Sequence, residues 1–263
     1  MQPLAVLYAE LATRMSPSSV AQLHAVHGAL QQAVRWSLIS RNPASAVRGP
    51  KVERPVIHPL TADQVRVLMA AASGDPLEPL YLTAVTTGMR SGELLGLQWQ
   101  DVDLDAARIQ VRRTLYRLNR GWWVGEPKTS AGRRAIALTA SAVDALRTHR
   151  LRQAEALLAV AIRIGPESLV FADRFGGPLN GFHLTERQFK PLLRRAGLPV
   201  IRFHDLRHTA ATLLLAQGIN PKVVAEMLGH ASVKVTLDVY SHVLPTMQEE
   251  AARRLDAALR GAG

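Results

Sequence analysis

Cysteine is absent from the sequence, which excludes a disulfide framework and a thiolate metal site. No apolar run approaches the roughly 20 residues that a membrane-spanning helix needs. The N-terminus does not resemble a secretory signal peptide. We therefore expect a cytoplasmic protein that does not enter a membrane.

Acidic residues are in the minority, because 21 Asp and Glu stand against 32 Lys and Arg, and the formal net charge is +11. A charge of this size on a well-patterned chain favours a polyanionic partner, nucleic acid above all. The alternative is a protein that is merely basic. Length and hydrophobic content allow one large core or two domains.

Residues 1–54 are predicted to form a small helical unit. Apolar side chains recur at helical spacing from Val20 to Ile39, and Asn42-Pro43 is expected to stop that helix. Two or three short helices are too few for an independent core. We therefore expect part of a larger helical domain whose beginning the chain lacks, followed by a Pro- and Gly-containing linker and a second domain over 55–263.

The second domain is predicted to be mainly α with a small antiparallel β-sheet. A capping box opens its first helix at Thr61. Short alternating apolar segments then have the period of strands. The expected strands are 102–104, 109–111 and 135–138. The expected helices are 77–87, 140–164, 185–197, 205–218, 221–229 and 232–243.

The stretch from His204 to Tyr240 concentrates the side chains that suit chemistry at a phosphate. Arg207 lies three residues after His204, so a helix brings both to one face. Arginine binds a phosphate with a bidentate fork, and Arg90 is a second candidate for the same clamp. Tyr240 is a candidate nucleophile that nearby cations or a base would activate.

Each candidate also has a plainer interpretation. Arg90 and Glu93 have the spacing of an ordinary helical ion pair, and Tyr240 that of a half-buried core residue. His204 and His208 have the i,i+4 spacing of a zinc helix, but the Glu that a zinc protease carries after the first His is replaced by Asp205. We therefore expect no metal. Lys128 is either an exposed turn lysine or a mobile general acid, and its sequence context does not decide between them.

Five segments in order resemble the tyrosine recombinases, or phage-type integrases. The resemblance is strong over about residues 58–245 and looser over the N-terminal helices, which look like a truncated core-binding domain. The matching segments are Thr87-Gly88-Met89-Arg90-Ser91-Gly92-Glu93-Leu94, Pro127-Lys128-Thr129, His204-Asp205-Leu206-Arg207-His208-Thr209, Leu228-Gly229-His230 and Asp238-Val239-Tyr240.

The resemblance implies a site-specific DNA recombinase that cleaves and rejoins DNA through a 3′-phosphotyrosyl intermediate. Tyr240 is then the nucleophile, Arg90 and Arg207 hold the non-bridging oxygens, and Lys128 protonates the leaving 5′-oxygen. The resemblance gives His204 a role in proton transfer or phosphate binding. The remaining implied roles are a phosphate hydrogen bond from His230, support of Arg90 by Glu93, and support of the His/Arg pair by Asp205. Neither a metal nor ATP is required, because the covalent link stores the bond energy.

The family further implies double-stranded DNA as partner, four protomers around two duplexes, and a bacterial or phage-encoded protein at the nucleoid. The C-terminal helix, placed at 246–263, is expected to dock on a neighbour or to pack on its own domain. Two other functions stay open. One is a DNA-binding remnant of an integrase, which the short N-terminus favours. The other is a type IB topoisomerase-like enzyme, against which the interaction tail argues.

Overall fold

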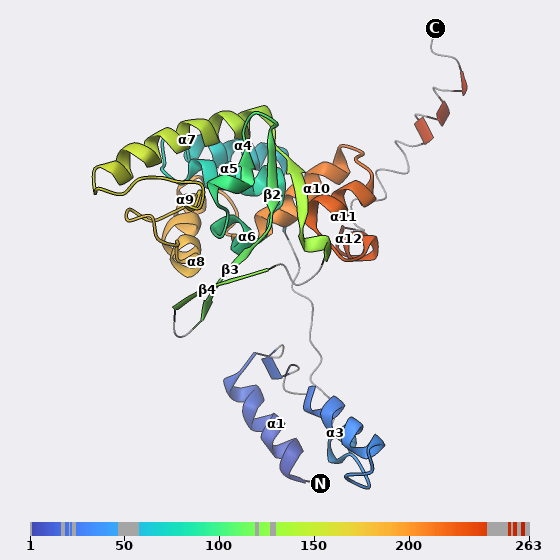
Figure 1. Ribbon diagram of the computed structural model, residues 1–263. Coiled ribbons are helices and arrows are strands. Elements are labelled where there is room, and N and C mark those ends of the chain that lie inside the picture. Colours follow the sequence, from blue (N-terminus) through green and yellow to red (C-terminus); the bar gives the residue numbers. More distant parts are fainter. Residues whose placement is uncertain are drawn as a thin grey trace. The chain divides into compact units, whose positions relative to one another are not determined.

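The computed structural model of the protein describes residues 2–16, 19, 20, 22, 25–46, 58–118, 121–126, 130–240, 252, 253, 255, 256, 259 and 260. The chain forms two compact units, residues 1–56 and 57–263. Figure 1 shows the helices and strands of each unit. Within the described residues, no helix is both long enough and apolar enough to cross a membrane.

The N-terminal unit contains helices α1 (Gln2–Arg14) and α3 (Ala25–Arg35) and a 3₁₀ turn η1 (Pro43–Ala46). The Asn42 amide stabilises the turn, because its Nδ2 donates to the His27 carbonyl over 3.1 Å and its Oδ1 accepts from the Ala44 amide over 2.9 Å. The predicted helix extends too far, since α3 ends at Arg35 rather than Ile39. Trp36 is 67% exposed, so its apolar side chain does not mark a buried helix face.

The second unit opens with helices that the capping rules predict. Thr61 is the N-cap of the first, and its side chain and that of Gln64 form the expected capping box. The next helix ends where Gly88 adopts a left-handed conformation with φ 62°. Residues 58–101 form α4 (Ala62–Ala71), α5 (Glu78–Thr87), α6 (Ser91–Leu95) and the 3₁₀ turn η2 (Trp99–Asp101).

Two small antiparallel sheets follow. The first has the order β1-β2-β5, with Ile109 opposite both Val102 and Ile136. The second is a β3–β4 hairpin that the sequence analysis did not predict, and Figure 1 shows it projecting from the unit. The strands are β1 (Val102–Asp103), β2 (Arg108–Val111), β3 (Thr114–Leu118), β4 (Gly121–Gly125) and β5 (Arg134–Ala137), with the 3₁₀ turn η3 (Ser130–Gly132) before β5.

Helices make up the rest of the unit. They are α7 (Ala140–Leu158), α8 (Gly181–His183), the π-helical turn η4 (Leu184–Phe189), α9 (Lys190–Arg195), α10 (Asp205–Ala216), α11 (Pro221–Leu228) and α12 (Val233–Tyr240). Two predicted boundaries are wrong. The helix from Ala140 ends at Leu158, and the helix expected from Thr185 begins earlier, because the Asn180 side chain caps it.

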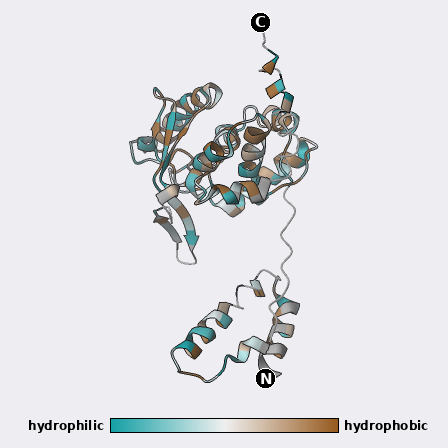
Figure 2. Ribbon diagram, turned by 90° about the vertical axis from the view of Figure 1, so that its right-hand side faces the viewer, coloured by the Kyte–Doolittle hydropathy of each residue, from teal (hydrophilic) through white to brown (hydrophobic). Residues whose placement is uncertain are grey.

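The main core lies among α4, α5, α7, α9 and the first sheet, where side chains such as Leu68, Tyr81, Ile109, Leu146 and Phe189 are almost fully buried. In Figure 2 the ribbon of this unit changes between brown and teal along its helices, because apolar and polar residues are interspersed in their sequences. Helix α5 packs against α7 and also against α10. Helix α5 is therefore held by neighbours, and the candidate site is carried by elements that pack around its end.

Candidate active site

The candidate site is built around the turn at Gly88, where three helices meet. A Cβ atom at this residue would lie 2.5 Å from Cδ2 of Leu228 on α11 and 3.4 Å from Cβ of Ala210 on α10. With φ 62°, the backbone is in the left-handed region that favours glycine. The residue is therefore required both for the turn and for the close approach of α10 and α11.

Arg207 lies in the first turn of α10 and is only 4% exposed. Its Nη1 donates a hydrogen bond of 2.8 Å to the Gly88 carbonyl. This contact fixes the buried guanidinium of Arg207 on the carbonyl of Gly88. Gly88 lies two residues before Arg90 in the same turn.

Arg90 lies directly before α6, and contacts from two directions fix its side chain. Nη1 donates to Oε1 of Glu93 over 2.7 Å, and Nη2 donates to the Gly229 carbonyl over 3.0 Å. The backbone amide of Arg90 donates to Oε2 of Glu93 over 2.9 Å. The Arg90 side chain is 39% exposed, so its remaining N–H groups are accessible to a ligand.

Glu93 is buried, with a side chain only 1% exposed. Arg134 donates to both of its carboxylate oxygens, over 3.1 and 2.9 Å. Burial raises the pKa of Glu93, but the hydrogen bonds from Arg134 and Arg90 outweigh burial and hold the pKa below its ordinary value. The carboxylate is therefore ionised and shared between two guanidinium groups.

His230 follows the left-handed turn at Gly229, which ends α11. Its Nδ1 lies 2.8 Å from Oγ1 of Thr236, which orients the ring. Burial, and then the charges of Arg207 and Arg90, lower the pKa of His230 to about 4. The imidazole is therefore neutral at physiological pH and lies in the field of both arginines.

His204 and His208 lie at the start of α10, with their ring centroids 5.5 Å apart in an edge-on arrangement. Desolvation by the surrounding protein, together with the charge of Arg207, lowers the pKa of His204 to about 4. The pKa of His208 is also lowered, chiefly by burial. Both rings therefore favour the neutral form, in which one ring nitrogen carries a lone pair.

The side-chain hydrogen bonds that the structure describes for Asp205 do not join it to His204 or Arg207, the pair that it was expected to support. Its carboxylate accepts from the backbone amide of Arg202 over 2.9 Å and from Nη2 of the same residue over 2.8 Å. No hydrogen bond joins it to the side chain of Arg207 or His204 within the described part of the chain. The carboxylate binds the backbone amide and the guanidinium of Arg202, which lies just before α10, and orients that side chain.

Two predicted site residues lie wholly or partly outside the described structure. Lys128 is not among the described residues, which end at Glu126 and resume at Ser130. Helix α12 extends to Tyr240, but the Tyr240 side chain is outside the description. Their roles remain predictions.

Arg134 is a member of the cluster that the sequence analysis missed. It is 7% exposed, and Nε donates to the Met227 carbonyl over 2.6 Å. One signal was available, because Arg134 and the buried Ile136 fall on the same face of β5. In the run Gly132-Arg133-Arg134, however, nothing in the sequence distinguishes the buried arginine from the exposed one.

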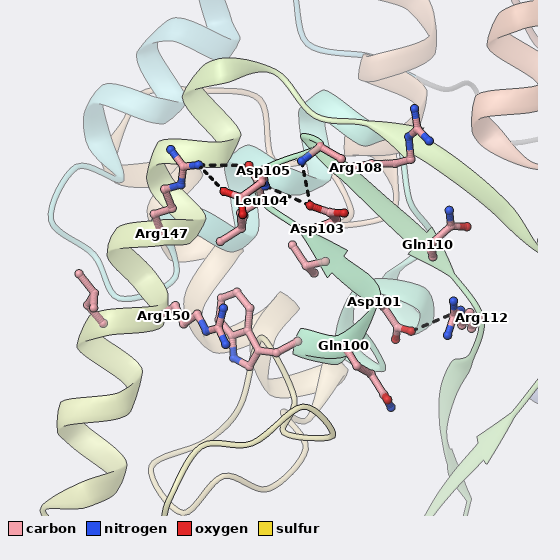
Figure 3. A pocket seen from close by; sticks show the side chains of 14 residues that line it. Gln100, Asp101, Asp103, Leu104, Asp105, Arg108, Gln110, Arg112, Arg147 and Arg150 are labelled. Carbon is pink, nitrogen blue, oxygen red and sulfur yellow. Dashed lines mark hydrogen bonds and ion pairs between the residues drawn. The ribbon is translucent and has the colours of Figure 1, made fainter.

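One cavity of the second unit lies away from this cluster. Its volume is about 850 Å³, and it lies between the first sheet and α7. Figure 3 shows that its charged side chains face one another, with Arg147 directed at Asp105 and Arg112 at Asp101. None of the predicted site residues whose side chains the structure describes lines it. Among the described residues, no group of three or more His, Cys, Asp or Glu could hold a metal ion.

Comparison with known proteins identifies a family. Residues 58–247 match the model of the Phage integrase family. The chain is 32% identical over 212 residues to the tyrosine recombinase XerC-like protein of Caldanaerobacter subterraneus subsp. tengcongensis, covering 76% of this chain and 54% of that protein. It is 30% identical over 229 residues to the ICEBs1 integrase of Bacillus subtilis, covering 86% of this chain and 62% of that protein.

Solved structures show the same fold. The Tn1549 transposon integrase in complex with transposon right end DNA is 26% identical with a TM-score of 0.71, covering 88% of this chain and 76% of that one. A λ integrase dimer bound to a core site is 21% identical with a TM-score of 0.61, covering 90% of this chain and 77% of that one. The chain spans between about half and three fifths of the length of the two curated relatives.

Proposed function

This chain belongs to the phage integrase family, and on that premise we propose that it cleaves and rejoins double-stranded DNA at specific sites through a covalent 3′-phosphotyrosyl intermediate. The observation that carries the proposal is the convergence of Arg90, Arg207 and His230. Arg207 binds the carbonyl of Gly88, and Arg90 binds the carbonyl of Gly229 next to His230. Residues far apart in the sequence thereby present two guanidinium groups and a neutral imidazole together.

The charge of this cluster suits a phosphodiester. Arg90, Arg134 and Arg207 contribute three positive charges, and Glu93 contributes one negative charge. The pentavalent transition state of phosphoryl transfer carries negative charge on its non-bridging oxygens. Preorganised cations at those oxygens supply a large share of catalysis. Arg90 and Arg207 are assigned to them, and the neutral His230 donates a further hydrogen bond.

The covalent step is assigned to Tyr240. Its phenolic oxygen bonds to phosphorus while the bond from phosphorus to the 5′-oxygen breaks, and Lys128 gives a proton to that oxygen. His204, whose lowered pKa leaves the ring neutral, accepts the phenolic proton. Attack by the free 5′-hydroxyl of a partner strand reverses the step and restores Tyr240. The step needs neither metal nor ATP, because the phosphotyrosyl bond retains the energy of the broken one.

The partners follow from the same proposal. The Tn1549 and λ integrases are bound to DNA in their structures, and the net charge of +11 suits the same partner here. We assign residues 1–54 to a partial core-binding domain, 55–263 to the catalytic domain, and 246–263 to a helix that joins protomers in a tetramer on DNA. The protein then acts at the nucleoid in the cytoplasm.

A nicked suicide duplex tests the proposal. The nicked strand loses the short segment that would reverse cleavage, so the covalent protein–DNA adduct accumulates. Wild-type protein is incubated with duplexes that carry the flanking sequences of the host element, with and without EDTA. We expect an adduct that EDTA does not reduce, and none with Tyr240→Phe. Tyr116→Phe, on the β3–β4 hairpin, is the matched control and should form the adduct. An adduct with Tyr240→Phe would exclude Tyr240 as nucleophile.

A further inference from the structure

We propose that Arg134 is a positioning residue of this site: it holds the Glu93 carboxylate and the end of α11 together, so that Arg90 presents its free N–H groups to the phosphate. This inference rests on the proposed function for its catalytic consequence. The Arg134 guanidinium is engaged in hydrogen bonds within the protein and is assigned no contact with the substrate. It acts through Arg90.

The first argument is the geometry of the Arg134 guanidinium, which joins three segments. It donates to both oxygens of Glu93 on α6 and, through Nε, to the Met227 carbonyl in the last turn of α11. Nη1 also donates to the Gly132 carbonyl over 3.1 Å. Four of the five guanidinium N–H groups are used in this way, so the side chain has a single well-defined orientation.

The second argument is the close packing of residues 131–134 against Gly229. A Cβ atom on Gly229 would lie 2.9 Å from the Ala131 carbonyl oxygen and 2.8 Å from Nη1 of Arg134. The Gly229 carbonyl is the one that accepts from Arg90. The segment before β5 is therefore seated on the turn that orients Arg90 and precedes His230. In the sequence, this segment begins three residues after Lys128.

The third argument is the distribution of charge. A buried carboxylate that has a single guanidinium partner accepts two parallel hydrogen bonds from it. The negative charge of the carboxylate and the positive charge of the guanidinium then cancel. In this site Glu93 accepts two N–H groups from the Arg134 side chain and one from the Arg90 side chain. The group of three then carries one net positive charge, and Arg90 keeps N–H groups for a ligand. Without Arg134, Glu93 would draw Arg90 toward itself and neutralise it.

Cleavage of modified DNA separates positioning from folding. The variants are Arg134→Ala, Arg134→Lys, Arg90→Ala and the double variant Arg90→Ala/Arg134→Ala. Arg113→Ala is the matched control, because it also removes a partly buried arginine from a buried carboxylate, that of Asp101. Each protein is given suicide duplexes with a phosphate or a neutral methylphosphonate at the scissile position.

We expect Arg134→Ala to lose about 100-fold in the rate of phosphate cleavage, the cost of a misplaced catalytic group, and clearly less with the methylphosphonate. Arg134→Lys should lose nearly as much, because an ammonium group cannot form the fork. In the Arg90→Ala background, removal of Arg134 should add only a few fold. Arg113→Ala should change both substrates equally. Additive losses, or an equal loss on both substrates with Arg134→Ala, would overturn the proposal.

A second measurement does not depend on cleavage. The Arg90 Nε–H resonance is followed by NMR during titration with inorganic phosphate. We expect the resonance to shift in the wild type and in Arg113→Ala, and to show no saturable shift in Arg134→Ala. If wild-type protein forms no adduct with any duplex, the proposed function fails, while this titration still decides the role of Arg134. An unchanged titration in Arg134→Ala would reject that role.

Discussion

Replacing Gly229 with alanine places a methyl group at the point where α11, the segment before β5 and Arg90 meet. The change has two costs. The first is conformational, because φ at Gly229 is 70°, and the left-handed region costs a residue with a side chain about 1–2 kcal/mol. The second is steric, because the new Cβ would lie 2.9 Å from a backbone carbonyl oxygen, that of Ala131.

A matched glycine separates these costs. Gly197 has a φ of 66°, and a Cβ there would meet nothing within 4 Å. Gly197→Ala should therefore lose only the conformational part, about 1–2 kcal/mol of unfolding free energy. Gly229→Ala should lose a further 1–3 kcal/mol or so, the typical cost of overpacking a tight site. Urea denaturation of both variants measures the difference.

The same change should affect cleavage, because the Gly229 carbonyl orients Arg90. A displacement of about 1 Å at a catalytic group costs on the order of 100-fold in rate. We expect such a loss of adduct formation with Gly229→Ala under conditions where the variant stays folded, and close to normal rates with Gly197→Ala. Equal destabilisation of the two variants, with normal cleavage by Gly229→Ala, would refute the packing described for this turn.

Three further predictions follow from the described residues. The pKa of His230 is lowered from 6.5 to about 4, so the unfolded chain binds a proton that the folded one excludes. The stability from this residue should be complete above about pH 6.5 and decline toward pH 4, by about 2 kcal/mol at pH 5. Urea denaturation at pH 7 and pH 5 should show a smaller decline for His230→Gln; equal declines would contradict the assignment. Tyr81 is 0% exposed, and among the described residues its hydroxyl has no hydrogen-bond partner. Tyr81→Phe should therefore leave stability unchanged or raise it by up to about 1 kcal/mol, and a loss of stability of about 1 kcal/mol or more would reveal a partner of the hydroxyl. DNA affinity should fall steeply with salt concentration because phosphate contacts release counterions, and a flat profile would argue against a basic DNA-binding surface.

Elements that are set by local rules were predicted from the sequence. The capping box at Thr61 and the helix ends next to Gly88 and Gly229 depend on residues within a few positions. The three strands of the first sheet were likewise visible from their alternation, and the mainly helical fold is confirmed. Local chemistry decided these features, so no knowledge of tertiary contacts was needed.

Three features of the structure were not predicted from the sequence. The β3–β4 hairpin carries two neighbouring tryptophans, and Trp123 is 63% exposed, so its side chains do not follow the inward–outward pattern of a core strand. Pairing between its own strands defines it instead. Asp205 was expected to support the His204/Arg207 pair, and that support stays a prediction. Its hydrogen bond to the Arg202 guanidinium, which lies before the helix and outside the motif, was not predicted. The burial of Arg134 depends on α6 and α11, which no local pattern reveals.

The site also explains why glycines and arginines occur together in these motifs. A carboxylate fixes a guanidinium and offsets part of its charge, as Glu93 does for Arg90, whereas a backbone carbonyl is neutral. The Gly88 carbonyl binds Arg207, and the Gly229 carbonyl binds Arg90. Both carbonyls belong to left-handed turns directly after a helix, where the last carbonyl groups lack helical partners and the helix dipole attracts cations. The glycines therefore serve the chemistry as well as the fold, because they turn helix ends into neutral acceptors that orient two cations and leave their charge for a phosphate.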